Sequence, residues 1–513
     1  VKRIREYKKM VWSNTLSYLT TFNNIHHLDF LAGYEIDDTY NDYLSGEAYN
    51  FTTPDKHAIS NGMKTVSVGG SDSRYRLVSY LSRLNYDYKN KYYLGASFRV
   101  DGSSRLHRDN RWGTFWSVSG AWRTIEEEFM QPVKDWLTDL RIRASYGVNG
   151  TLPSDYFGYM GLSSISGGYL EQPGIQMSQI ANPNLKWETN YNMNIGLDFG
   201  FWDRLNFTIE YYTRTTKNLL MDCPVSMTTG FSSYLMNIGE VKNKGIELTI
   251  NSTNIKIKDF SWNTTFNLGH NSNKVVKLDG EQTQIVSGTQ IHKVGSSYRT
   301  FYVQEFAGIN PETGNPLFYT NELDENGNYI KEITENSKNA QFIPYKHAEP
   351  TVNGGISNSL RYKWLDLNFL FSYQFGGYSY DTWAQKTEHG GYDSYANIPT
   401  YYRDSWKKPG DQTNIEVYMP GKSSSVSMHK ITSSRRIHST DYFRLKNITF
   451  GITLPKEWTN KINIGNVRFY ASASNLWTWA AYDNYDPEAV SAGSATQTTP
   501  PLKTVTFGLN INF

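Results

Sequence analysis

The chain of 513 residues has very little of three things that would assign it to a familiar protein class. It contains one cysteine, Cys223, which excludes an intramolecular disulfide framework and a cysteine-rich metal cluster. No stretch approaches the roughly 18 consecutive apolar residues that a transmembrane helix needs. The formal net charge is only +2, which is too small to indicate a nucleic acid or another strongly charged partner.

What the chain does have is many aromatic residues and a strict alternation of apolar and polar residues. It contains 14 Trp, 38 Tyr and 25 Phe, yet its mean hydropathy is -0.57, so its apolar residues do not gather in continuous segments. Residues 503–513 are apolar at every second position from Val505 to Phe513. About ten alternating residues are enough to cross a bilayer as a tilted β-strand. A final strand that ends on an aromatic residue is typical of outer-membrane barrels, whose last strand pairs with the first.

The same period of two residues recurs along the whole chain. Met193, Ile195 and Leu197 face one way and their polar neighbours the other, and the pattern resumes at Leu205 after a tight turn at residues 203–204. Such a hairpin has one apolar face and one polar face. We expect roughly fifteen strands of this kind, at residues 12–20, 27–34, 75–88, 92–100, 114–124, 140–148, 193–199, 205–212, 245–252, 260–271, 354–362, 364–375, 442–454, 467–476 and 503–513.

The connections between these segments alternate between short and long. Residues 253–258 and 362–364 are brief links, whereas the long connections are rich in Gly, Ser, Asn, Thr and Tyr. Short periplasmic turns and long extracellular loops are the arrangement of outer-membrane barrels. The sequence therefore predicts an all-β fold, a large antiparallel transmembrane β-barrel. The expected long loops are residues 35–74, 150–188, 273–350 and 377–441.

Several segments share the order and spacing of motifs from one family of outer-membrane proteins. They are DGSSR at 101–105 with NRWG at 110–113, LRIRASYG at 140–147, NPNLKWE at 182–188, TGF at 229–231 with NIG at 237–239 and NKG at 243–245, YFRLKNITFG at 442–451, and YDPE at 485–488. Together they resemble SusC/RagA-type TonB-dependent transporters, from about residue 75 to the end of the chain. Trp116 stands where that family usually has Pro, and the segment HSTD at 438–441 replaces an acidic-Gly-Ser segment.

This resemblance implies a barrel of about 22 strands with a plugged lumen in the outer membrane of a Gram-negative bacterium. Residues 1–513 would then be the C-terminal portion of the barrel, and the N-terminal plug and the first strands would lie outside this chain. The resemblance also implies import of oligosaccharides or peptides, a SusD-like lipoprotein as a lid, and TonB with its inner-membrane proton-motive-force complex as the driving partner. The alternative is a non-transporting surface glycan-binding β-protein or a passive pore.

The sequence contains no arrangement that indicates an enzyme. Neither H-E-x-x-H nor G-x-S-x-G occurs, so we expect no catalytic residues and no cofactor. The segment DENGN at 324–328 has its Gly at position four, whereas a calcium loop of the EF-hand type requires it at six, so we expect a solvated turn and no metal site. Asp101, Arg105, Arg111 and Arg143 are interpreted mainly as structural residues at strand ends or on polar strand faces.

The segment 377–402 carries the strongest indication of ligand binding. Aromatic rings can stack on the apolar faces of sugars, and neighbouring polar side chains can bond their hydroxyl groups. The alternative is that the rings pack the loop against itself or against the lid protein. The predicted substrate-binding residues are Tyr380, Trp383, Tyr392, Tyr401 and Tyr402, with further rings at Tyr378 and Tyr395 and polar side chains at Asp381, Gln385, Glu388, His389 and Asn397.

Overall fold

The structure is a computed structural model that describes residues 1–51, 53, 55, 58–169, 172–278, 283–392, 397–421, 428–459, 461, 464–496 and 498–512. Tyr395 and Phe513, which the sequence assigned to a binding loop and to the last strand, lie outside the described residues. The chain divides into two compact units. Unit 1 comprises Val1–Pro132, Leu140–Gly196 and Tyr212–Val241, and unit 2 comprises Val133–Asp139, Leu197–Tyr211 and Lys242–Phe513.

The principal sheet has 15 strands, and its strand order follows the chain. Each of the segments predicted from the alternating pattern overlaps one of these strands, with its ends differing by at most two residues where it runs past the strand, which confirms the all-β prediction and the expected strand number. The strands are β1 (Lys2–Phe22), β2 (His26–Phe51), β3 (Gly62–Tyr88), β4 (Tyr92–Ser103), β5 (Trp112–Trp122), β6 (Leu137–Thr151), β9 (Glu188–Phe201), β10 (Leu205–Lys217), β13 (Glu240–Lys256), β14 (Phe260–Lys277), β24 (Val352–Tyr362), β25 (Leu365–Phe375), β28 (Tyr442–Thr453), β29 (Asn466–Ala480) and β31 (Thr504–Asn512). No helix in the described part of the chain is long and apolar enough to cross a membrane.

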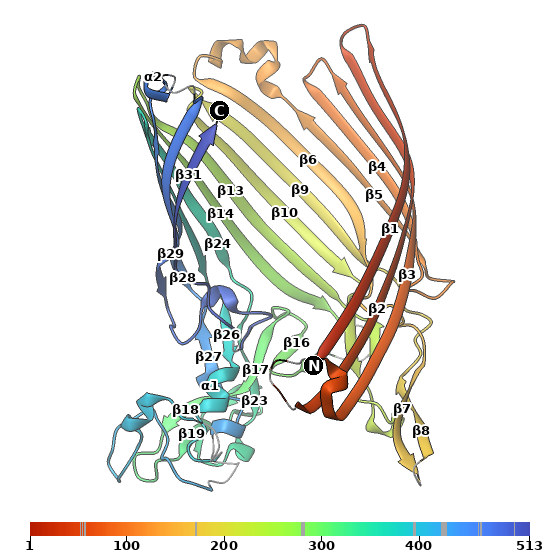
Figure 1. Ribbon diagram of the computed structural model, residues 1–513, viewed down its shortest axis with the longest axis vertical. Helices are drawn as coiled ribbons and strands as arrows, with labels where there is room; N and C mark the ends of the chain where they lie inside the picture. The colour runs from red at the N-terminus through yellow and green to blue at the C-terminus, as the bar shows by residue number, and fades with distance from the viewer. Residues whose placement is uncertain are drawn as a thin grey trace. The chain divides into compact units, whose positions relative to one another are not determined.

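In unit 1 the first three strands are much longer than the sequence predicted. β1, β2 and β3 span 21, 26 and 27 residues and run side by side (Figure 1), so the expectation of a loop at residues 35–74 is wrong for residues 35–51 and 62–74. The polar extension of β2 is acidic and lies between two basic strands. Asp37 pairs with Lys9 of β1 at 2.8 Å, and Asp38 pairs with Arg74 and Arg76 of β3 at 2.5 and 2.6 Å. These cross-strand charges stabilise a ladder that the local composition does not reveal.

The two faces of the unit 1 strands differ as the alternating pattern predicts. On one face, aromatic rings form a row across β1, β2 and β3, in which Trp12 contacts Tyr34 at 5.9 Å and Tyr34 contacts Tyr80 at 5.1 Å between ring centroids. On the other face, Arg99 bonds Asp101 at 2.7 Å. In this part of the strands, beyond the charged extension at Asp38, one face is therefore apolar and aromatic and the other is polar.

The connections of unit 1 differ in length, and residues 23–25 and 89–91 are short turns. Residues 89–91 form one of these short turns, in which Lys89 and Asn90 take the left-handed conformation that such a turn needs. The long connections 104–111, 152–187 and 218–239 lie at the opposite strand ends, and they carry the hairpins β7 (Leu162–Tyr169) with β8 (Gln172–Gln179) and β11 (Leu220–Pro224) with β12 (Ser233–Asn237). Leu185 and Trp187 of the NPNLKWE motif pack with Leu106 and Phe115 in one buried cluster.

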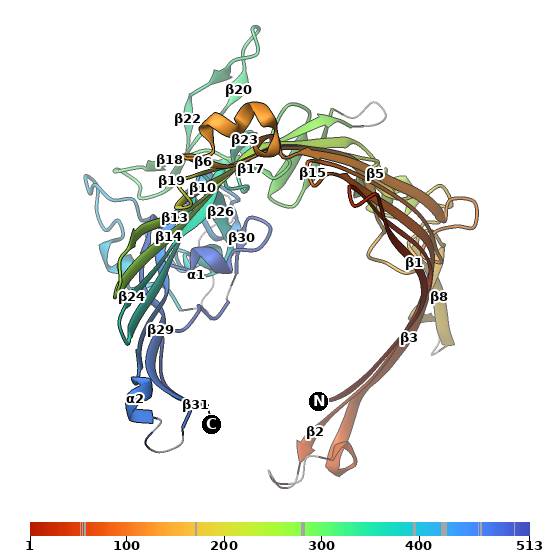
Figure 2. The same ribbon diagram turned by 90° about the horizontal axis from the view of Figure 1, so that it is seen from above.

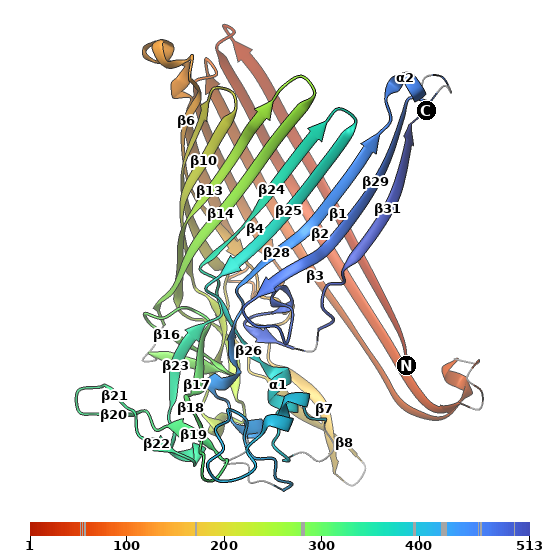
Figure 3. The same ribbon diagram turned by 90° about the vertical axis from the view of Figure 1, so that its left-hand side faces the viewer.

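In unit 2 the short turns and the long connections again lie at opposite ends of the strands, as Figures 1 and 3 show. Residues 257–259 and 363–364 are turns at one end. The long connections 278–351, 376–441 and 481–503 lie at the other end and contain most of the small elements. These are β15 (Gln284–Ser287), β16 (Gln290–Lys293), β17 (Thr300–Gln304), β18 (Phe306–Ile309), β19 (Pro316–Tyr319), β20 (Glu322–Leu323), β21 (Tyr329–Ile330), β22 (Ile333–Thr334), β23 (Phe342–His347), β26 (Tyr378–Asp381), α1 (Thr382–Thr387), β27 (Ile437–Ser439) and β30 (Ser494–Ala495), while α2 (Lys456–Thr459) lies at the turn end.

The last strand shows how the polar and apolar faces are separated in unit 2. Leu509 of β31 lies opposite Phe469 of β29 on the apolar face. On the polar face, the ring of Tyr470 lies over Gly508, where a Cβ atom would collide with it. Arg468 of the same face pairs with Asp366 of β25 at 2.6 Å. The period of two in the C-terminal segment is therefore a real separation of two surfaces.

Candidate functional site

The predicted binding segment is part of a small folded body at the long-connection end of unit 2. We call residues 376–441 and 481–503 together the loop body, and residues 481–503 alone the last connection. β26 pairs antiparallel with β27 and parallel with β30, and the amide of Tyr380 donates to the carbonyl of Gly493 at 2.8 Å. Figure 2 shows α1 beside β30. Two connections that are about a hundred residues apart in sequence thus share one three-stranded sheet.

The short helix α1 begins at a residue that also binds the last connection. Asp381 caps the helix by accepting the amide of Ala384 at 2.8 Å, and its other carboxylate oxygen accepts the hydroxyl of Tyr482 at 3.0 Å. Thr382 donates its hydroxyl to the carbonyl of Ala495 at 2.5 Å. The first turn of α1 is therefore fixed in position by the cap and by the last connection together.

Two of the five predicted substrate-binding residues belong to the interior of the loop body. Tyr380 is 1% exposed and packs with Phe301, Val303 and Ile437, and Tyr402 is 6% exposed. Burial raises the pKa of both phenols, which keeps them neutral at physiological pH. In this structure their rings support the loop body and do not form its surface.

The other three predicted residues differ in how accessible they are. Trp383 is 42% exposed and Tyr392 is 36% exposed, whereas Tyr401 is half-buried. Tyr401 donates its hydroxyl to Glu388, and burial raises its pKa to about 12. Of the polar residues predicted beside these rings, Glu388 and His389 are buried.

Two arginines, Arg435 and Arg436, hold the C-terminal end of α1 through Glu388. Arg436 is 1% exposed and pairs with Glu388, and Arg435 approaches the same carboxylate at 3.5 Å. Burial lowers the pKa of Arg436 to about 10, so it remains a cation at neutral pH. Arg435 also lies over the ring of Phe306, with its guanidinium 5.1 Å from the ring centroid. Both ends of α1 are thus fixed by side chains from distant parts of the chain.

Trp383 lies at the wall of a cleft of about 840 Å³ between α1, the last connection and the ends of β28 and β29. Arg444 of β28 and Thr478 of β29 line its floor, and both belong to the polar face of the unit 2 strands, because Arg444 lies opposite Ser372 on the face of Asp366. The contribution of the last connection to this cleft is not among the features predicted from the sequence. The YDPE motif was the available signal, since its two acidic residues match two basic residues of the RLKN segment in number and spacing.

The two motifs bind each other and fasten the last connection to the strands. Arg444 is 2% exposed, pairs with Asp486 at 2.5 Å and also with Glu488, and donates its Nε–H to Thr478 at 2.9 Å. Lys446 pairs with Glu488 at 2.6 Å. We call this cluster of Arg444, Lys446, Asp486 and Glu488 the latch.

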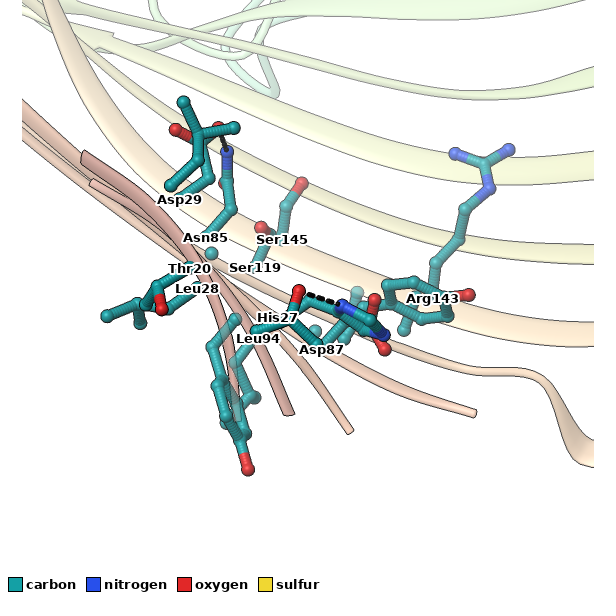
Figure 4. Close-up of a pocket in the computed structure, with 18 of the residues that line it drawn as sticks. Thr20, His27, Leu28, Asp29, Asn85, Asp87, Leu94, Ser119, Arg143 and Ser145 are labelled. Atoms are coloured by element: carbon teal, nitrogen blue, oxygen red, sulfur yellow. Dashed lines mark hydrogen bonds between the residues drawn. The ribbon is translucent and has the colours of Figure 1, made fainter. Parts of the chain in front are cut away.

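Unit 1 has a second hollow, of about 810 Å³, on the polar face of its strands near the short turns. His27 bonds Thr21 at 2.9 Å, and Asn85 bonds Asp29 at 3.3 Å (Figure 4). Arg143, Ser119 and Ser145 also line this hollow. The interpretation of Arg143 as a residue of a polar strand face agrees with its place here.

The remaining residues interpreted as structural also make internal contacts. Asp101 is 7% exposed and accepts from Arg99. Arg105 donates to the carbonyl of Pro153 at 3.0 Å and lies over the ring of Tyr75, 4.0 Å from its centroid. The carbonyl of Arg111 accepts the indole N–H of Trp187 at 3.0 Å.

The chain is similar to known proteins of one family. The family model described as TonB dependent receptor-like, beta-barrel, matches residues 4–329. TonB-dependent receptor P3 of Formosa agariphila is 32% identical over 98% of this chain and 52% of its own length. TonB-dependent receptor SusC of Bacteroides thetaiotaomicron is 30% identical over 92% of this chain and 47% of its own length.

Solved structures agree with these relatives. The chain superposes with a TM-score of 0.88 on the structure of the RagAB peptide transporter, at 27% identity over 100% of this chain and 56% of that one. The chain spans about half the length of the curated relatives that it matches. The family model covers more than half of the chain, and the family is one of outer-membrane β-barrels and not of enzymes. The chain therefore belongs to the TonB-dependent receptor β-barrel family, of the SusC/RagA type, and is an outer-membrane protein.

Proposed function

We propose that the chain forms part of the wall and mouth of a TonB-dependent importer that carries oligosaccharides or peptides across the outer membrane. The observation that supports this most directly is the fastening of the last connection by the latch on the polar face of the unit 2 strands. A passive pore can conduct small solutes without a large folded body at its mouth. An importer of large solutes needs a structured surface there that captures the solute before transport.

The proposed assembly extends beyond this chain. The plug and the first strands of a barrel of about 22 strands would be supplied by sequence outside residues 1–513. TonB with its proton-motive-force complex would release the plug, and a SusD-like lipoprotein would close the mouth. The similarity to the TonB-dependent receptor SusC and to the RagAB peptide transporter supports these partners, and the second similarity supports peptides as a substrate class. Oligosaccharides are proposed from the resemblance of the sequence motifs to the SusC/RagA type.

The five aromatic residues predicted from the sequence have different parts in this proposal. Trp383 and Tyr392 are exposed and are proposed to contact the substrate. Tyr401, half-buried against Glu388, would contact it at one edge. Tyr380 and Tyr402 would act from the interior, by keeping the loop body in one conformation.

The test is uptake by cells that produce the full-length protein together with its lipoprotein. Fluorescent neutral oligosaccharides and peptides are supplied in parallel, in cells with and without TonB and with and without an uncoupler of the proton gradient. The proposal expects uptake of at least one class that stops when TonB or the gradient is removed. Uptake that persists without either would identify a passive pore, and surface binding without uptake would identify a non-transporting binding protein.

A further inference from the structure

We propose that the cleft between α1 and the last connection is a binding site for an uncharged oligosaccharide, with the ring of Trp383 as its stacking surface. This inference rests on the function proposed above and narrows its substrate class. The volume of about 840 Å³ lies within the range of roughly 300–1,000 Å³ that ligand sites occupy. The cleft opens on the polar face of the unit 2 strands, where a solute entering the barrel would pass.

Trp383 is available for stacking because the fold holds its helix but leaves its side chain exposed. Asp381 and Thr382 bind the first turn of α1, while the indole of Trp383 is 42% exposed at the cleft wall. A pyranose ring has an apolar face of C–H groups, and a flat aromatic ring is the side chain that covers such a face best. The aromatic residues that hold the loop body together, such as Tyr380, are buried elsewhere.

The charged groups inside the cleft already have bonding partners within the protein, which favours an uncharged ligand. Arg444 is 2% exposed and bound to Asp486 and Glu488. Asp381 is 2% exposed and accepts bonds from Tyr482 and from the amide of Ala384. The two exposed charges at the cleft, Asp483 and Lys503, are of opposite sign. The cleft therefore has little net charge to offer a phosphate, a sulfate or a peptide terminus.

Hydroxyl and amide groups supply most of the remaining polar lining. Each can donate and accept a hydrogen bond, as the hydroxyl groups of a sugar do. A ring of such groups beside an exposed indole matches a ligand with an apolar face and a hydroxylated rim. These residues are Asn475, Thr478, Asn484, Thr496, Thr498 and Thr499.

The walls of the cleft are held at a fixed separation before any ligand arrives. The parallel pairing of β26 with β30 joins α1 to the last connection on one side. On the other side, Asn475 takes a left-handed conformation, with φ of 54°, and donates its side-chain amide to the carbonyl of Leu502 at 3.2 Å. A preformed site avoids the cost of ordering its walls on binding.

The experiment is calorimetric titration of the full-length protein, purified in detergent together with its lipoprotein. The probes are neutral hexasaccharides of glucose, xylose and mannose, a sulfated hexasaccharide and an uncharged hexapeptide. We expect at least one neutral hexasaccharide to bind. Trp383→Ala should weaken that binding by about 5- to 150-fold, and Trp383→Phe should weaken it less. Tyr418→Ala removes an exposed ring that lies in the connection 376–441, as Trp383 does, but outside the cleft. This variant should leave the affinity for the sugar unchanged.

A second variant separates the site from the stability of α1. Thr499→Val removes one hydroxyl from the cleft lining and leaves the helix untouched, so it should cause a smaller loss of affinity for the same sugar. Wild-type affinity in both Trp383→Ala and Thr499→Val would overturn the site, and binding of only the sulfated sugar or the peptide would overturn the ligand class. Either result leaves the proposed TonB-dependent uptake unaffected. Conversely, sugar binding by a protein that shows no TonB-dependent uptake would overturn the proposed import and leave the binding site in place.

Discussion

Replacing Arg444 by methionine should detach the last connection from the strands. Arg444 is 2% exposed and neutralises two carboxylates, so its loss leaves Asp486 and Glu488 together in a partly buried site. Removing one partner of a buried ion pair costs about 3–5 kcal/mol, because the remaining charge is uncompensated. Lys446 still contacts Glu488 at 2.6 Å, so we expect the lower end of that range, about 3 kcal/mol. This corresponds to an opening equilibrium about 100-fold more favourable.

Hydrogen exchange followed by mass spectrometry measures that opening directly. In Arg444→Met, the amides of β26 and β30 should exchange about 100-fold faster than in the wild type, while those of β29 serve as an internal reference. Lys446→Met is the matched control. Its side chain is 39% exposed, so the loss of its pair should cost about 1 kcal/mol or less.

A rescue variant distinguishes uncompensated charge from lost packing. Adding Asp486→Asn and Glu488→Gln to Arg444→Met removes the stranded charges, and part of the protection should return. Wild-type exchange in the single variant would refute the latch as the element that fastens the last connection. Equal exchange in the single and triple variants would show that packing, and not charge, holds it.

Three other predictions follow from the same structure. Leu509→Arg should cost about 2–4 kcal/mol of folding free energy in lipid vesicles because the side chain lies on the apolar face, whereas Thr506→Arg on the polar face should cost much less; equal costs would contradict the assigned faces. Gly508→Ala should lower folding yield through collision with Tyr470, and Tyr470→Ser in the same chain should restore it; no recovery would exclude that collision as the cause. Burial lowers the pKa of His438 to about 4, below the ordinary value of about 6.5. Because only the unfolded chain takes up the proton between these values, the loop body should lose stability as the pH falls from 6.5 towards 4. Thermal melts of His438→Gln should show a flatter pH dependence than those of the wild type, and an unchanged pH dependence would refute the role of His438.

The strands could be predicted from the sequence because the period of two is a local property. The apolar row that runs from Val505 to Ile511 needs no information from elsewhere in the chain, and the same holds for the hairpin that turns at residues 203–204. Family-like motifs then identified the barrel. The prediction of a loop at residues 35–74 was wrong because their acidic stretch forms a strand only when the basic strands β1 and β3 lie on either side of it.

The binding segment was predicted only in part, for a similar reason. Its rings are visible in the sequence, but which of them are buried depends on partners far away in the chain. Tyr380 is covered by Phe301 and Ile437, and Trp383 becomes one wall of a cleft only because β30 pairs with β26. Composition can show that a loop is rich in aromatic residues, and only the tertiary structure shows which rings reach the surface.

The residues that hold the last connection in place are different from those that line the rim of the cleft. Arg444, Asp486 and Glu488 fix the base, while the threonines of residues 496–499 that line the cleft are exposed. Substitutions at the rim can therefore accumulate at little cost in stability, since exposed positions tolerate change. Protein engineers could use the same division to graft new rim sequences onto an unaltered base, and natural selection could reach new specificities by the same route.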